Sequence, residues 1–114
     1  MRAAALLGAV FLVGCGSGEQ RLARTDVRPL LALTTRVAHE GACAQARDIA
    51  AVQRQALRLV NQGRVPAELQ EPFFSGVNEL GERTPTCAPT DEGHGKRAAQ
   101  QATKLGAWLE EYSR

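Results

Sequence analysis

The chain has 114 residues, the length of one small domain, and 44% of them are hydrophobic, an ordinary value for a globular protein. Its 14 basic and 12 acidic residues are spread along the chain and give a formal net charge of +2. Such a charge creates no strong long-range field, so composition excludes a typical nucleic-acid-binding protein.

The beginning of the chain has the layout of a secretory signal. Met1 and Arg2 form a short positive head, and residues 3–13 form an apolar segment. At about 1.5 Å per residue, about 12 apolar residues extend about 20 Å, whereas a hydrocarbon core is about 30 Å thick. We therefore predict a signal peptide over residues 1–14 rather than a membrane-spanning helix.

The signal ends at Leu12-Val13-Gly14-Cys15, which resembles the lipobox of bacterial lipoproteins. The resemblance implies that the Cys15 thiol receives a diacylglyceryl group and that cleavage after Gly14 makes Cys15 the N-terminus. The alternative is an ordinary signal with an incidental cysteine, but such signals more often end in an Ala-x-Ala site, which is absent here. We expect residues 15–24 to be the lipidated cysteine and a flexible tether, with the protein on the outer face of the cytoplasmic membrane.

Two further cysteines, Cys43 and Cys87, follow the leader. Export takes them to an oxidising compartment, where an even pair is more often joined than free. His39 precedes Cys43 by four residues, but two groups do not make a zinc site and no third ligand is suitably spaced. We predict a disulfide and no metal.

Two amphipathic helices are predicted in the first half of the domain. One extends from Asp26 to His39 with Pro29 in its first turn, although it could begin near Glu19 with Pro29 as a kink. The second spans residues 42–62 and contains neither proline nor glycine. Its apolar stripe consists of Ile49, Val52, Ala56, Leu59 and Val60, with Leu57 widening it.

The second half predicts one or two more helices. A third helix begins at Pro66, ends near Arg83 and has Leu69, Phe73, Val77 and Leu80 on one side. Residues 84–96 are rich in proline, glycine and threonine and indicate a mobile loop. A last helix from Lys96 to Tyr112 has small residues, among them Gly106, where a neighbour could approach closely.

The second and third helices should fold back antiparallel, because only a short turn at residues 63–65 joins them. This hairpin brings Cys43 and Cys87 to the same end, so the hairpin and the disulfide support each other. The sequence therefore predicts an all-α fold over residues 25–114: a small bundle of three or four helices with a disulfide-linked helical hairpin.

No catalytic constellation stands out. Residues 91–96, DEGHGK, combine carboxylates with His94 but fit a solvated loop better than a metal or anion site. Ser75 lacks a nucleophile motif, and only its convergence with His94 and an acid would suggest hydrolysis. The carboxylates occupy helix positions that look exposed. We expect a protein that is not an enzyme and needs no cofactor.

Aromatic residues supply the candidate contact surface. Phe73 and Phe74 are adjacent on a helix, so one enters the core and the other, Phe74, lies at its edge. Trp108 lies beside its helix stripe, and packing into the core is favoured over a half-exposed position against the hairpin or a partner. The lipobox, the tether and the lack of catalytic residues favour a lipid-anchored envelope protein that binds another envelope protein or serves as a spacer, with Phe74 and Trp108 as candidate contacts. The alternative is a carrier of a small apolar ligand, in a cavity lined by Phe73, Leu57 and Leu105.

A second resemblance covers about half of the chain. The stretch from Thr25 to Cys87, with an Ala-rich helix followed by GRVPAELQEPFFSGVNEL and a cysteine, is similar to small secreted or lipid-anchored proteins of GC-rich bacteria. The resemblance implies an envelope location and a helical fold. It supplies no catalytic residues.

Overall fold

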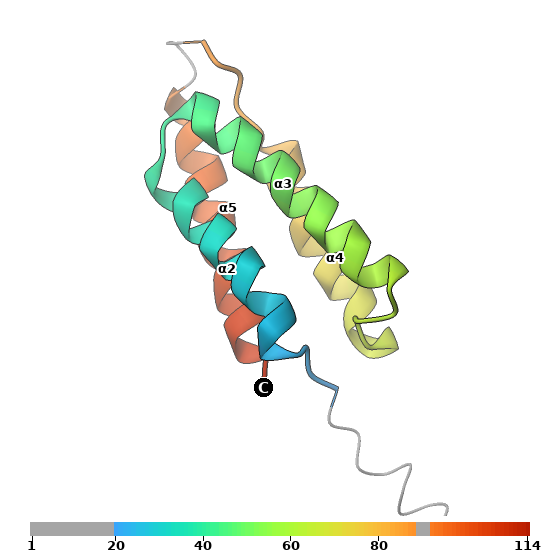
Figure 1. The fold of residues 1–114 in the computed structure, drawn as a ribbon. Helices are drawn as coiled ribbons and strands as arrows, with labels where there is room; N and C mark the ends of the chain where they lie inside the picture. The colour runs from blue at the N-terminus through green and yellow to red at the C-terminus, as the bar shows by residue number, and fades with distance from the viewer. Residues whose placement is uncertain (1–19, 89–91) are drawn as a thin grey trace, which may run out of the picture.

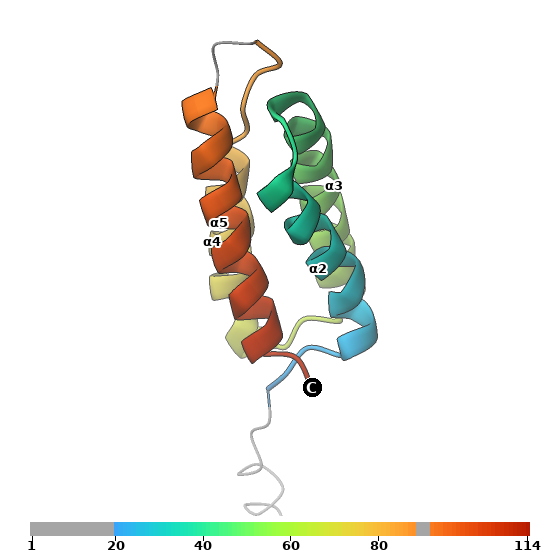
Figure 2. The same cartoon turned by 90° about the vertical axis from the view of Figure 1, so that its left-hand side faces the viewer.

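The computed structural model describes residues 20–88 and 92–114. These residues form four helices, α2 (Arg24–His39), α3 (Ala42–Asn61), α4 (Ala67–Glu82) and α5 (Glu92–Glu111), and contain no strand. The helices lie side by side in one bundle (Figures 1 and 2). In it α2 packs against α3 and α5, and α4 packs against the same two helices. The predicted all-α bundle is confirmed, with four helices.

The core forms because each helix has apolar residues at three- and four-residue intervals, and these place one stripe of side chains on one side. The predicted stripes of α3 and α4 are buried, except that Leu57 is exposed and Val60 only partly buried. The α5 stripe adds small side chains as well as leucines. The buried apolar residues are Leu22, Val27, Leu30, Val37, Ile49, Val52, Ala56, Leu59, Val65, Leu69, Phe73, Val77, Leu80, Ala98, Ala102, Leu105 and Leu109.

A disulfide joins Cys43, in the first turn of α3, to Cys87, which follows α4, with their Cα atoms 4.6 Å apart. The two helices can return antiparallel because the chain reverses at Gly63, whose φ of 69° favours glycine. The predicted disulfide and hairpin are confirmed together.

Two helices begin at other residues than the sequence predicted. Helix α2 begins at Arg24, two residues before Asp26 and five after the alternative start at Glu19, so Pro29 lies in its second turn. Helix α5 begins at Glu92 rather than Lys96. The predicted loop over residues 84–96 is therefore wrong at its C-terminal end, while residues 89–91 lie outside the described part of the chain. A Gly-rich start does not prevent a helix whose later residues are held by packing.

The described part of the predicted tether, residues 20–24, is attached to the folded domain. Leu22 is buried in the core, its N–H donates to the Tyr112 carbonyl (2.8 Å), and its carbonyl accepts from the Arg114 N–H (3.1 Å). Arg21 adds a hydrogen bond to the Glu111 carbonyl at 2.8 Å. The folded domain thus begins near residue 21 instead of 25, because the Leu22 side chain packs in the core and its backbone pairs with the residues that follow α5. Residues 15–19 lie outside the described residues.

Two glycines allow close helix contacts. A Cβ at Gly106 would lie 3.3 Å from Thr34 Oγ1, and one at Gly76 would lie 3.0 Å from Leu105 Cδ1. Gly106 thus lets α5 approach α2, as its position in the sequence indicated, and Gly76 lets α4 approach α5.

Candidate functional site

The predicted contact residues belong to a row of aromatic rings across α4 and α5. The Phe73 ring centroid is 6.1 Å from those of both Phe74 and Trp108, and Trp108 is 4.9 Å from Tyr112. Phe73 is fully buried, while the other three are half-buried. The row therefore leads from the buried ring of Phe73 to the half-buried rings of Phe74, Trp108 and Tyr112.

Phe74, a residue of α4, and Trp108, a residue of α5, lie on opposite sides of the α4 helix. Trp108 faces α4 from α5, because its ring packs near Phe73. Phe74 lies two turns before Gly81, which faces Gln53 of α3, and residues seven apart share a helix side. The two residues thus mark two separate surfaces, one along the α4–α5 seam and one along the α3–α4 seam.

Phe74 borders a depression on the outer side of α4. The depression has a volume of about 610 Å³ and is lined by Glu71, Phe74, Ser75, Asn78, Glu79 and Glu82. Three carboxylates around one half-buried ring give this surface an acidic character. Such a surface suits a partner with basic side chains around an apolar group.

The residues named for an apolar ligand cavity do not converge. Phe73 and Leu105 are 0% and 3% exposed within the core, whereas Leu57 points outward and is 53% exposed. Three depressions on the described residues lie elsewhere: at the disulfide end, on α4, and between α2 and α5. These three side chains therefore do not line one cavity of the kind that the alternative of an apolar-ligand carrier would require, because Leu57 lies at the edge of the α3 stripe.

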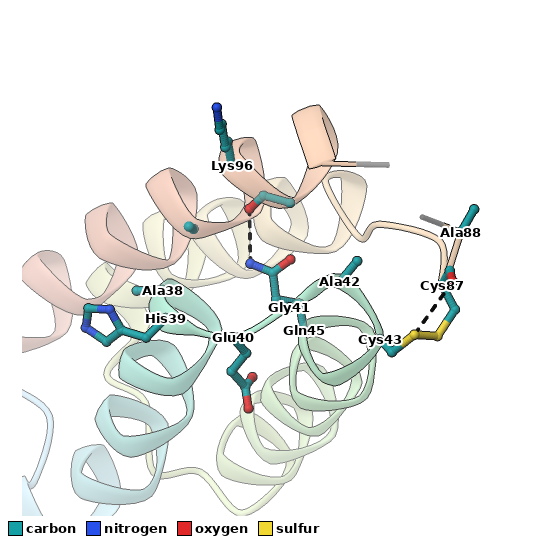
Figure 3. Close-up of a pocket in the computed structure, with 12 residues that line it drawn as sticks. Ala38, His39, Glu40, Gly41, Ala42, Cys43, Gln45, Cys87, Ala88 and Lys96 are labelled. Atoms are coloured by element: carbon teal, nitrogen blue, oxygen red, sulfur yellow. Dashed lines mark hydrogen bonds between the residues drawn. A yellow bond between two sulfur atoms is a disulfide. The ribbon is translucent and has the colours of Figure 1, made fainter. Parts of the chain in front are cut away.

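The disulfide end of the bundle holds a second depression, of about 650 Å³ (Figure 3). The end of α2, the start of α3, the segment at Cys87 and the first turns of α5 form its walls. Cys43 and Cys87 are exposed at its border, and Lys96 points outward from α5. Its lining residues are Ala38, His39, Glu40, Gly41, Ala42, Cys43, Gln45, Cys87, Ala88, Gly95, Lys96 and Ala99.

Gln45 holds three helices together beneath this depression. It is only 2% exposed, and its Nε2 donates to the Val37 carbonyl (2.8 Å) and the Gly95 carbonyl (3.0 Å) (Figure 3). Its Oε1 has no hydrogen-bond partner among the described residues and packs against Gly95, where a Cβ would lie 3.1 Å away. The two carbonyls fix the amide orientation, so Gln45 is a structural clamp between α2, α3 and α5.

A second buried polar group joins α2 to α3. Arg36 donates from Nη2 to Asp48 Oδ1 at 2.8 Å and from Nε to Oδ2 at 3.2 Å, and the Asp48 side chain is 5% exposed. The expectation that all carboxylates are exposed is therefore wrong for Asp48. Sequence contained a signal for it, because residues 45, 48 and 52 fall on one side of a helix and Val52 belongs to the apolar stripe.

Glu40 and Asp48 respond to this environment in opposite directions. The hydrogen bond from Arg36 lowers the pKa of Asp48, although burial opposes it. Burial raises the pKa of Glu40, and the neighbouring Asp48 raises it further. The Glu40 Oε1 atom is buried without a hydrogen-bond partner among the described residues. Arg36 thus favours the charged form of Asp48, whereas burial favours the neutral form of Glu40.

The remaining candidates for chemistry lie apart. Ser75 is next to Gly76, which faces Leu105, and His94 lies eleven positions before Leu105, about 16 Å along the α5 axis. Ser75 and His94 therefore do not converge. His39 is exposed in the last turn of α2. No group of three His, Cys, Asp or Glu side chains suited to a metal ion is found within residues 20–88 and 92–114.

The comparisons with known proteins give no match: no family model, no curated protein and no solved structure is similar to this chain. Among the helices of the described residues, none has the length and apolar character needed to cross a membrane.

Proposed function

We propose that the chain is a lipid-anchored, non-catalytic protein of the cell envelope whose helical domain binds another envelope protein. The half-buried Trp108 carries the binding part of this proposal, because it continues a fully buried aromatic contact out to the surface between α4 and α5. Tryptophan and tyrosine are enriched where proteins bind one another, and Tyr112 lies beside Trp108.

The lipobox at Leu12–Cys15 supports the anchor, and the Cys43–Cys87 disulfide supports an oxidising location. Leu22, the first residue buried in the core, follows Cys15 by seven positions. Seven extended residues span at most about 25 Å. A lipid on Cys15 would thus hold the end of the bundle that contains the start of α2 and the end of α5 close to the membrane.

The filled core favours partner binding over the alternative of an apolar-ligand carrier. A carrier needs an internal cavity of about 300–1,000 Å³ lined by apolar groups. Phe73 and Leu105 instead pack within the core, and Leu57 lies outside it.

Membrane attachment is tested with Cys15→Ser. We expect the wild-type protein to incorporate labelled fatty acid and to sediment with membranes, and the variant to do neither. Ser17→Ala, two residues further on, is the matched control and should behave like the wild type. Fatty acid incorporation into Cys15→Ser would contradict the anchor.

Partner binding is tested by affinity capture from solubilised envelopes. Trp108→Ala should lose a specifically captured protein, whereas Leu57→Ala, which changes an exposed apolar side chain on another helix, should retain it. A capture pattern unchanged by Trp108→Ala would remove the role given to the α4–α5 seam.

A further inference from the structure

The outer face of the α3–α4 hairpin has two apolar side chains at its centre. Leu57 lies one turn after Gln53, and Gln53 is the α3 residue that faces Gly81 of α4. Phe74 lies two turns before Gly81, on the same side of α4. Both residues therefore lie along the α3–α4 seam, where Leu57 is 53% exposed and Phe74 half-buried.

Leu57 and Phe74 lie at similar levels, that is, at similar positions along the bundle axis. Leu57 precedes the end of α3 by four residues and Phe74 follows the start of α4 by seven, and one short turn joins these helix ends. At about 1.5 Å per residue, their levels differ by about 5 Å. Helical geometry thus places the two apolar side chains at neighbouring positions on either side of the seam.

The two helices have opposite charge on their exposed sides. Helix α3 exposes Arg47, Arg54 and Arg58, while its only acidic residue, Asp48, is buried and paired with Arg36. Helix α4 contains four glutamates and no basic residue. The exposed glutamates include Glu71 and Glu82, whose spacing of three helical turns puts them on one stripe.

The charged residues match in level as well. Near the turn, Arg58 lies three residues before the end of α3 and Glu71 lies four residues after the start of α4. Farther from the turn, Arg47 lies fourteen residues before the end of α3 and Glu82 lies fifteen residues after the start of α4. In each pair the levels differ by about 1.5 Å. If two copies of the chain are related by a two-fold axis parallel to the helices, each residue keeps its level along that axis, and α3 of one copy lies against α4 of the other.

We propose that this face binds a second copy of the chain in a two-fold symmetric dimer. Leu57 and Phe74 of the two copies form its apolar centre, and the α3 arginines of each copy pair with the α4 glutamates of the other, as flanking charges do in antiparallel helix pairs. The dimer depends on neither the lipid anchor nor an envelope partner. It leaves the α4–α5 seam with Trp108 open.

The size of the face predicts a reversible dimer. Helix α4 is about 24 Å long and two neighbouring helices are about 20 Å wide, so each copy contributes about 500 Å². The total of about 1,000 Å² is at the lower limit for specific complexes. We therefore expect monomer and dimer to exchange as protein concentration changes.

The test is charge reversal on the purified full chain in a neutral detergent, with mass measured by sedimentation equilibrium. R47E/R58E gives α3 acidic residues opposite the α4 glutamates of the other copy, and E71R/E82R gives α4 basic residues opposite the α3 arginines. Each variant alone should therefore dimerise at least tenfold more weakly than the wild type. An equimolar mixture of the two variants restores opposite charges at both contacts and should form a heterodimer of near wild-type affinity. R28E/K104E, which reverses two exposed charges on α2 and α5, should leave dimerisation unchanged.

A wild-type chain that stays monomeric up to its solubility limit would overturn the proposal. A dimer that both variants still form would place the contact on another face and overturn it too, as would a mixture that does not associate. Circular dichroism melts of each variant distinguish loss of association from loss of folding. Because no other protein is present, the result is independent of the capture experiment with envelopes.

Discussion

Removing the Cys43–Cys87 disulfide should lower stability with little change in the folded structure. Both cysteines are exposed, so Cys43→Ala/Cys87→Ala removes almost no buried surface and leaves no cavity. The double variant therefore isolates the effect of the covalent link on the unfolded chain.

The magnitude follows from the closed loop, which spans a sequence separation of 44 residues. In the chain-entropy model, a loop of this length removes about 13 cal/mol/K from the unfolded state, or about 4 kcal/mol at 25 °C. Domains of this size have total stabilities of about 5–15 kcal/mol. We therefore expect the variant to lose about 2–4 kcal/mol and still fold at 25 °C.

Urea unfolding followed by circular dichroism measures this loss. The midpoint should fall and the slope m should rise, because an unlinked chain exposes more surface when it unfolds. Wild-type protein in reductant is the matched control and should give the same free energy as the double variant. A loss below about 1 kcal/mol, or a Cys87 thiol that reacts in the unreduced wild-type protein, would refute this reasoning.

Four further outcomes follow from core side chains and from the two carboxyl groups whose pKa values are shifted. Phe73→Ala should cost about 3–5 kcal/mol, measured by urea unfolding, because it opens a cavity at the centre of the core. Leu22→Ala should cost about 2–3 kcal/mol and increase hydrogen exchange at the Arg114 amide, whose acceptor is the Leu22 carbonyl; unchanged exchange would contradict the docking of this segment. Because the folded pKa of Asp48 is lowered from its ordinary 3.8, the stability that it contributes is present above pH 3.8 and lost as pH falls through the folded value. The contribution of Glu40 to stability depends on pH in the opposite direction: because its folded pKa is raised, this contribution is complete below pH 4.5 and is lost as pH rises through the folded value. In thermal melts, Glu40→Gln should therefore be more stable than the wild type at pH 7 and equally stable at pH 4.

The hairpin was predictable because it depends on local patterns. Apolar residues such as Ile49, Val52 and Ala56 recur at helical spacing, and a glycine follows the helix where the chain must turn. The positions of Cys43 and Cys87 at matching ends then added a long-range restraint. One covalent pair and two periodic segments were enough to predict the topology of half the bundle.

The polar contacts between helices were not predictable in the same way. Gln45 and Asp48 lie on the buried side of α3, yet the carbonyls of Val37 and Gly95 and the guanidinium of Arg36 become their partners only when three helices meet. Leu22 was missed because one apolar residue in a polar segment has no periodicity. The sequence left open whether Trp108 packs in the core or reaches the surface, and the separation of its seam from that of Phe74 depends on how α4 packs between α3 and α5.

The hydrogen bonds that join Leu22 to Tyr112 and Arg114 bring the segment before α2 beside the segment after α5. A short linker could connect these ends, and the chain could be reopened at the exposed turn around Gly63, giving a circular permutant with the same helix packing. Such a permutant would carry its new ends at the α3–α4 turn and would convert the disulfide hairpin into a link between the first and last helices.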